Sequence, residues 1–354
     1  MLLTVIVICI IGLISIYSAS YSYGTETPYF QKQVLWFLVS LVVMAIVTMV
    51  DFRFLERISP LLYILFIILL VYVLFYGTGG PGSKVSRWIK VGPVFFQPSE
   101  FAKYVLVLYL AYYFNESRRI GELGLKDIVL PAIATLIPFA LILQQPDLGT
   151  AVLLLFVFVP IVFLAGFRLK LILFTSILGF ISVPFGWIFL LKKYQRTRFE
   201  TFFNPDLDPL GTGYQIIQSK IAIGSGQFWG KGYLKGTQAR LNFLPARHTD
   251  FIFSVFTEEW GFFGGALLVG LYLFLILWCL RHVGKTKDRS GTILTLGVTT
   301  VLAFQIIINI GMVLGLMPIV GMPLPFMSYG GSALLSQMIG VGLILNVRMR
   351  RYDI

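Results

Sequence analysis

Long apolar stretches alternate with short polar segments along the whole chain. Ten of these stretches are long enough to cross a hydrocarbon core about 30 Å thick as a helix. They lie at about residues 2–19, 34–50, 60–76, 98–114, 128–144, 148–165, 171–191, 261–280, 291–315 and 329–346. The pattern predicts an all-α polytopic membrane protein with about ten transmembrane helices. Residues 1–354 are expected to form a single integral membrane domain.

Composition supports this class, because the 354 residues are 57% hydrophobic and only 12% charged. Soluble domains carry about 25% charged residues, so little room remains for a separate soluble domain. The first apolar stretch has no basic segment before it, which favours a span over a signal peptide. Cys9 and Cys279 both fall inside apolar stretches, where we expect buried thiols rather than a disulfide.

The distribution of Lys and Arg predicts the orientation. With a cytoplasmic N-terminus, the inner segments carry fourteen Lys and Arg, and the short outer loops carry four. Because positive loops stay inside, both termini are predicted to be cytoplasmic. Residues 192–260 then form a large extracytoplasmic loop between spans seven and eight, with amphipathic segments inside it.

This loop is basic: residues 192–250 hold nine Lys and Arg against four acids. One interpretation is contact with anionic lipid headgroups. The other is an anionic ligand on the outer face, which the position of the charge on the translocated side favours. Arg196 and Arg198 are two residues apart, and on an extended segment both would face one cluster of anionic oxygens.

The most unusual polar segment, LPARHTDFIFSVFTEEWGFFGG, leads directly into the uncharged stretch 261–280. Ionisable groups are costly inside hydrocarbon, so this segment is predicted to lie outside it. Asp250, Ser254 and Glu258 are four residues apart and would share one helical face. We therefore expect an amphipathic helix on the outer surface.

Ionisable residues also occur where spans four and six begin. Pro98 is predicted to open span four, with Glu100 in its first turn and Lys103 three residues later. The two charges could pair only structurally or could serve a site, since ionisable residues inside spans are functional candidates. In QQPDLGT, Pro146 is predicted to open the next helix, and Asp147 is either a cap or a site residue.

Two further features concern the last spans. The segment PLPFMSYGGS is rich in Pro and Gly, which predicts a re-entrant or broken segment beside protein or water. Gln305 and Asn309 are four residues apart and are expected to form interhelical hydrogen bonds. The polar groups gather at one side of the membrane, whereas a transporter places them near the midplane. This favours an outward-facing reaction or binding site.

Six of these motifs together resemble the SEDS family (shape, elongation, division and sporulation). The resemblance follows nearly the whole chain in order through RWIKVGPVFFQPSEFAK, QQPDLGT, RTRFETFFNPD, GYQIIQSKIAIGSG, LPARHTDFIFSVFTEEWG and PLPFMSYGGS. GKGYLKGTQ is more similar to the elongation members than to the division members. One departure is Ala246, where the family commonly has Glu, so a carboxylate role at that position is not expected here.

The resemblance implies a ten-span SEDS fold in the bacterial cytoplasmic membrane and a peptidoglycan glycosyltransferase active in cell elongation and rod shape. Its substrate would be lipid II, polymerised into β-1,4 glycan strands on the outer face, and its partner a class B penicillin-binding protein. Asp250 would be catalytic. Substrate-binding positions would be Trp88, Glu100, Lys103 and Asp147, to which the residues add Arg196, Arg198 and His248. Membrane lipids surround the chain, and no nucleic acid is expected.

This chemistry needs a base for the attacking sugar hydroxyl and cations for the departing diphosphate. Direct displacement inverts the anomeric centre. Two other functions remain open: a lipid II flippase and a non-catalytic scaffold for the penicillin-binding protein. The metal question also stays open, because no cofactor is certain and Asp147, Glu100 and Asp250 could supply oxygen ligands to Mg²⁺ or Mn²⁺.

Overall fold

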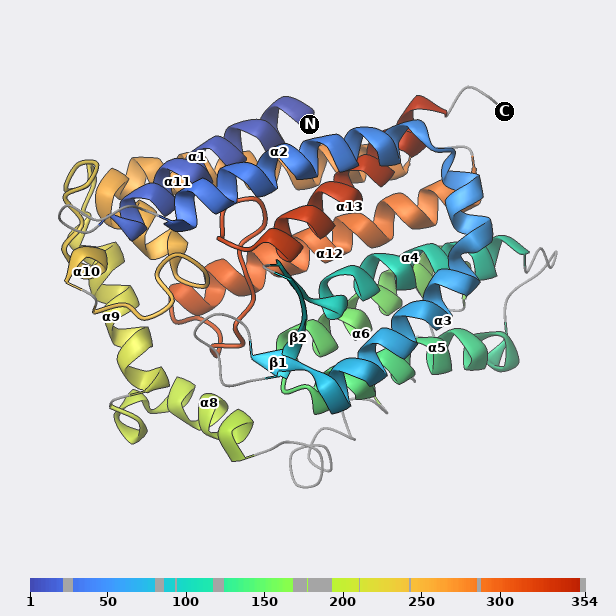
Figure 1. The fold of residues 1–354 in the computed structure, drawn as a ribbon, viewed down its shortest axis with the longest axis horizontal. Helices are drawn as coiled ribbons and strands as arrows, with labels where there is room; N and C mark the ends of the chain where they lie inside the picture. The colour runs from blue at the N-terminus through green and yellow to red at the C-terminus, as the bar shows by residue number, and fades with distance from the viewer. Residues whose placement is uncertain are drawn as a thin grey trace. The chain divides into compact units, whose positions relative to one another are not determined.

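A computed structural model shows the fold (Figure 1). It describes residues 1–21, 28–79, 86–92, 94–116, 124–167, 177, 193–209, 211–241, 243–284 and 288–350. The predicted span 171–191 lies outside the described residues, apart from position 177. Within them, seven helices have the length and apolar composition to cross a membrane.

These helices confirm the polytopic all-α class. The seven are α1 (Leu2–Ser20), α2 (Pro28–Met49), α3 (Phe52–Tyr76), α5 (Leu125–Gln144), α11 (Ile252–Val283), α12 (Arg289–Val313) and α13 (Gly331–Met349). Two more of the predicted stretches are helical, as α4 (Pro98–Glu116) and the shorter apolar helix α6 (Leu148–Leu164). The apolar stretches therefore locate the helices to within a few residues in most cases.

The chain divides into two compact units. Unit 1 comprises residues 1–40, 192–278 and 303–337, and unit 2 comprises residues 41–191, 279–302 and 338–354. Four of the five divisions fall inside helices, namely α2, α11, α12 and α13.

Unit 2 is built around α4. This helix contacts α3, α5 and α6, and these four helices run side by side in Figure 1. Residues 98–108 of α4 are buried on every face, as expected for a central helix. A small antiparallel sheet that the sequence did not predict precedes α4. Its strands are β1 (Thr78–Gly79), β2 (Ser86–Val91) and β3 (Val94–Phe96), in the order β1-β2-β3.

Unit 1 contains α1, four shorter helices from the region after residue 192 and most of α11. The shorter helices are α8 (Lys193–Phe203), the 3-10 helix η1 (Pro205–Leu207), α9 (Thr212–Ser225) and α10 (Thr237–Arg240). Between α12 and α13, residues 314–330 form no helix. Leu324, Phe326 and Met327 of this segment are nevertheless buried. The predicted broken segment is therefore present and is enclosed by protein.

Candidate functional site

The first group of predicted site residues lies at the beginning of α4, in unit 2. Pro98 is the first residue of α4, as predicted. Lys103 Nζ lies 2.5 Å from Glu100 Oε2, and the side chains are 0% and 4% exposed. The predicted ion pair is therefore formed, and it is almost completely shielded from solvent. Removal of either charge would leave the other buried without a counter-ion, which is strongly destabilising.

Asp147 lies at the beginning of α6 and caps it. Its Oδ1 accepts a hydrogen bond from Thr150 N at 3.3 Å, so the helix begins at Leu148. The prediction that Pro146 opens the helix is wrong, because the cap is formed by the next residue. The capping interpretation of Asp147 is confirmed.

The Asp147 carboxylate also has a cationic partner that the sequence did not predict. Arg87 Nη1 lies 3.8 Å from Asp147 Oδ1, and Arg87 Nε donates to Gln145 O at 3.1 Å. Arg87 belongs to β2, next to Trp88, whose ring packs edge-on against Phe95 at 6.5 Å between centroids. Adjacent strand residues point to opposite faces. β2 therefore directs the side chains of Arg87 and Trp88 to opposite faces of the sheet.

Asp250 ends the loop that precedes α11, in unit 1. Its backbone carbonyl accepts a hydrogen bond from Asn309 Nδ2 at 3.0 Å, and the same nitrogen donates to Met322 O at 2.6 Å. Ser328 Oγ donates to the Thr249 carbonyl at 2.7 Å. Asn309 of α12 and Ser328 thus hold the backbone at residues 249 and 250. This backbone carries the Asp250 carboxylate. Asn309 Nδ2 therefore bonds to two non-helical segments, and not to another helix as the sequence predicted.

The Asp250 side chain is half-buried and faces the non-helical segment. A Cβ added at Gly321 would lie 3.5 Å from Asp250 Oδ2, and Gly321 has φ +71°. Only glycine adopts this conformation without strain. The backbone of residue 321 therefore lies close to the carboxylate, at a position where any other side chain would be strained.

His248 organises the same loop through its ring and backbone. Its imidazole stacks on Tyr29 at 4.4 Å between ring centroids, and its carbonyl accepts from Tyr329 N at 2.9 Å. Burial, with a smaller contribution from Arg247, lowers the pKa of His248 below its ordinary value. The imidazole is therefore neutral at neutral pH, which favours stacking over a cationic role.

Arg196 and Arg198 lie on α8, and the predicted extended segment is wrong. On a helix, residues two apart point to different sides, so the two guanidinium groups do not face one ligand together. Arg198 Nη1 donates to the Ile319 carbonyl at 3.3 Å. Arg198 is thereby attached to the same non-helical segment that contacts Asp250.

The predicted amphipathic helix after Asp250 is the first part of α11, and it does not lie on a surface. Residues 251–259 are all buried. Ser254 and Glu258 do share one face, but each bonds to protein: Ser254 Oγ lies 2.8 Å from Ser219 Oγ. The sequence pattern was correct for the helix and wrong for its surroundings.

Glu258 binds the beginning of α10. Its Oε1 accepts from Lys231 Nζ at 2.6 Å, from Thr237 N at 2.8 Å and from Gln238 N at 3.2 Å. Glu258 is fully buried, so these donors replace water around its charge. The adjacent Glu259 accepts from Ser18 Oγ of α1. The two acids therefore attach two other elements to α11.

A kink at Gly261 explains why a loop can bind α11 here. Gly261 has φ 66° and ψ −163°, a region that only glycine enters readily. The kink frees backbone groups that a straight helix would pair. Lys231 N donates to the Glu258 carbonyl at 3.0 Å, and Phe262 N donates to the Gln227 carbonyl at 2.8 Å. The loop after α9 thus completes the broken helix.

We expect Glu258→Gln to lower the free energy of unfolding by about 3 kcal/mol, because charged hydrogen bonds to a buried acceptor are lost. Glu200→Gln, at an exposed acid on α8, is the matched control and should change it by less than about 0.5 kcal/mol. Denaturant titration in detergent measures both. Equal effects would show that the Glu258 network adds nothing to stability.

The structure thus places the candidate residues in three sets, one in unit 1 and two in unit 2. Asp250, His248 and Arg198 are connected through residues 319–329 in unit 1. Glu100 and Lys103 form one pair in unit 2, and Asp147 forms another with Arg87. Among the residues that the structure describes, no group of three or more His, Cys, Asp or Glu side chains is placed to hold a metal ion.

Comparison with known proteins identifies the family. The family model described as "Cell cycle protein", named for FtsW, RodA and SpoVE, matches residues 1–353. The peptidoglycan glycosyltransferase MrdB of Escherichia coli K12 is 39% identical over 351 residues, which cover 99% of this chain and 93% of MrdB. The peptidoglycan glycosyltransferase RodA of Treponema pallidum is 37% identical and covers 99% of this chain and 97% of its own length.

Solved structures agree with these relatives. A chain of a peptidoglycan synthase complex that coordinates polymerization and crosslinking superposes with a TM-score of 0.82 at 34% identity, over 100% of this chain and 98% of that chain. RodA of Thermus thermophilus superposes with a TM-score of 0.73 at 30% identity, over 99% and 96%. This chain belongs to the FtsW, RodA and SpoVE family, which confirms the SEDS resemblance.

Proposed function

We infer that the chain is a peptidoglycan glycosyltransferase that polymerises lipid II, a disaccharide-pentapeptide on undecaprenyl diphosphate. Family membership and the names of the full-length relatives support the activity. The observation that carries the assignment to a site is the Asp250 loop. Its backbone is fixed by Asn309 and Ser328, so the Asp250 carboxylate is carried on a rigid part of the loop.

In the proposed reaction, the acceptor hydroxyl attacks the anomeric carbon of the donor. Asp250 takes the hydroxyl proton as general base, a new C–O bond forms, and the bond to the diphosphate breaks. The diphosphate leaves with the electron pair. One displacement inverts the α-linked donor into a β-1,4 glycan.

Cationic side chains stabilise the departing diphosphate in this proposal. Arg196 and Arg198 are the candidates from the sequence, although α8 points them to different sides. Trp88, Glu100, Lys103 and Asp147 are proposed to line the substrate cavity. A divalent cation would supply additional charge at the diphosphate, and chelation with EDTA during the assay tests that contribution.

The proposed partner is a class B penicillin-binding protein, whose transpeptidase would crosslink the new strands. The similar chain from a complex that coordinates polymerization and crosslinking supports this partner. Labelled lipid II in proteoliposomes tests the function against its rivals. Glycan strands on a gel support a polymerase. Movement of lipid II across the bilayer without strands identifies a flippase, and partner binding without either activity identifies a scaffold.

We propose that both termini are cytoplasmic and that residues 192–250 lie outside the cell membrane. Asp206 is exposed on η1 and Arg57 is exposed at the beginning of α3. We expect Asp206→Cys to react with an impermeant thiol reagent in intact spheroplasts and Arg57→Cys to react only after lysis. The native Cys9 and Cys279 are buried and should contribute little background. Labelling of Arg57→Cys alone in intact cells would invert the topology.

A further inference from the structure

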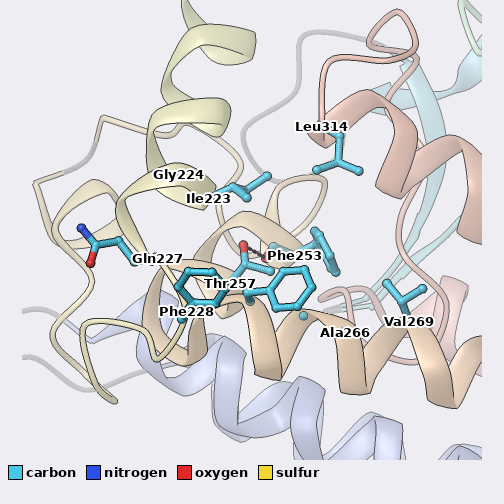
Figure 2. A pocket seen from close by; sticks show the side chains of 12 residues that line it. Ile223, Gly224, Gln227, Phe228, Phe253, Thr257, Ala266, Val269 and Leu314 are labelled. Atoms are coloured by element: carbon cyan, nitrogen blue, oxygen red, sulfur yellow. Dashed lines mark hydrogen bonds between the residues drawn. The ribbon is translucent and has the colours of Figure 1, made fainter.

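An apolar cavity of about 710 Å³ lies in unit 1, between the C-terminal turn of α9 and α11 (Figure 2). Its polar side chains are Gln227 and Thr257, and the remaining lining is aliphatic, aromatic or glycine. Binding pockets of this size, about 300–1,000 Å³ and mostly apolar, accommodate organic ligands. The composition therefore indicates a hydrocarbon ligand.

The lining follows one face of α11. Phe253, Thr257, Gly261, Gly265 and Val269 all line the cavity and recur every four residues. At 1.5 Å per residue, Val269 lies about 12 Å beyond the Gly261 kink. The two glycines remove side-chain volume from the middle of this face. The cavity is therefore a groove along the helix, a shape that suits an extended chain.

The groove opens sideways where α11 enters its apolar stretch. Val269 is 41% exposed and Phe262, another lining residue, is 62% exposed. α11 is long and apolar enough to cross a membrane. A chain that lies in the bilayer could therefore enter the groove without passing through water.

The groove is held open by hydrogen bonds rather than by apolar packing alone. Ser219 Oγ of α9 donates to the Val313 carbonyl at the end of α12 at 2.6 Å and lies 2.8 Å from Ser254 Oγ of α11. A Cβ on Gly226 would lie 2.2 Å from the Thr257 carbonyl, so α9 approaches α11 through a glycine. The three walls of the groove are thus fixed to one another.

A cation lies at the edge of this groove. Lys220 is on α9, three residues before the lining residue Ile223. A Cβ built on Gly315 would lie 2.6 Å from Lys220 Nζ, and Gly315 adjoins Leu314, which lines the groove. Within the described part of the chain, Lys220 forms no ion pair. An ammonium group beside an apolar groove suits an anionic head on a hydrocarbon chain.

The same elements carry Asp250. Phe253 follows Asp250 by three residues, and Leu314 follows Asn309, the donor to the Asp250 carbonyl, by five. A chain in the groove would therefore have its head near the loop assigned to catalysis. This proximity favours a substrate chain over an unrelated membrane lipid.

We propose that this groove binds the polyprenyl chain of the lipid-linked sugar substrate next to its diphosphate, and that Lys220 binds the diphosphate. The inference rests on the proposed function, since that function supplies a polyprenyl diphosphate. The groove positions the chain, and Lys220 stabilises charge on the leaving group or on the bound head.

The test compares two chain lengths. Ala266 lines the groove, whereas a Cβ on Gly270 of the same helix meets no atom within 4 Å. We expect Ala266→Phe to lower kcat/KM about tenfold for lipid II with its full undecaprenyl chain, because a displaced chain misplaces the head. A farnesyl analogue should be affected less than about twofold. Gly270→Phe is the matched control and should affect neither substrate.

Lys220→Met should lower kcat/KM about tenfold or more for both chain lengths, because a charged contact to the diphosphate is lost. Lys235→Met, at an exposed lysine of the same loop region, is its control. Equal losses from Ala266→Phe and Gly270→Phe, or no loss from Lys220→Met, would overturn the proposal.

Native mass spectrometry with undecaprenyl phosphate separates this proposal from the function itself. We expect the wild type to retain undecaprenyl phosphate over phosphatidylglycerol, and Ala266→Phe to lose that preference. Retention of phosphatidylglycerol by both proteins would show a phospholipid site and overturn the proposal. A wild type that prefers undecaprenyl phosphate but makes no polymer would contradict the proposed function and leave the groove assignment supported.

Discussion

Lys103→Met is expected to lower the free energy of unfolding by about 3–5 kcal/mol, because it leaves the Glu100 carboxylate buried without its cation. Lys103 is 0% exposed and Glu100 only 4%, so water cannot replace the lost partner. α4 is enclosed by three other helices, and the strain cannot be relieved by turning the carboxylate outward. Chemical unfolding in detergent measures the loss.

The double variant Glu100→Gln with Lys103→Met separates packing from function. Replacing both charges removes the unpaired carboxylate, and neutral replacement of a buried pair is often nearly neutral for stability. We expect most of the lost stability to return while lipid II polymerisation stays at least about tenfold below wild type. Normal polymer yield from a stable double variant would show that the pair is structural alone.

Asp250→Asn is expected to lower the rate of polymerisation by about 100-fold or more, because general-base catalysis typically contributes 10²–10⁴. The amide keeps the shape of the carboxylate but cannot take the proton. The bonds from Asn309 and Ser328 go to backbone carbonyls, so the substitution leaves them in place. Thermal stability and partner binding should stay near wild type, and initial rates with labelled lipid II measure the effect.

His248→Gln is the comparison for that prediction. The neutral imidazole is stacked on Tyr29, so its loss should loosen the loop and lower the rate by about tenfold or less. If His248→Gln is inactive while Asp250→Asn polymerises within a few-fold of wild type, the base is His248 and the assignment of Asp250 is wrong.

The sequence predicted correctly those features that depend on residues close together in the chain. Apolar length located most of the helices, Pro98 marked the beginning of α4, and the spacing of Glu100 and Lys103 predicted their pair. Each of these depends on residues within one or two turns.

Long-range partners could not be read from the chain. The Glu258 stretch looks amphipathic, yet it is buried, because a loop more than twenty residues earlier supplies its hydrogen-bond donors. Arg87 is one of the four Lys and Arg of the short outer loops, and the sequence did not predict the sheet that brings it to Asp147. Arg196 and Arg198 were placed on an extended segment because the helical pattern of α8 is weak in a polar sequence.

The groove on α11 was missed for a related reason. Gly261 and Gly265 lie inside a predicted span, where glycine is common. The cavity forms because α9 packs against the face of α11 on which these two glycines lie.

The role of Asp250 is tested most directly by a structure of the Asp250→Asn variant with lipid II bound. If Asp250 is the general base, the 4-hydroxyl of the acceptor sugar lies about 2.6–3.2 Å from the side chain at position 250, with the donor anomeric carbon in line beyond it. Acceptor hydroxyls far from position 250, with His248 or another base in contact instead, would contradict this role.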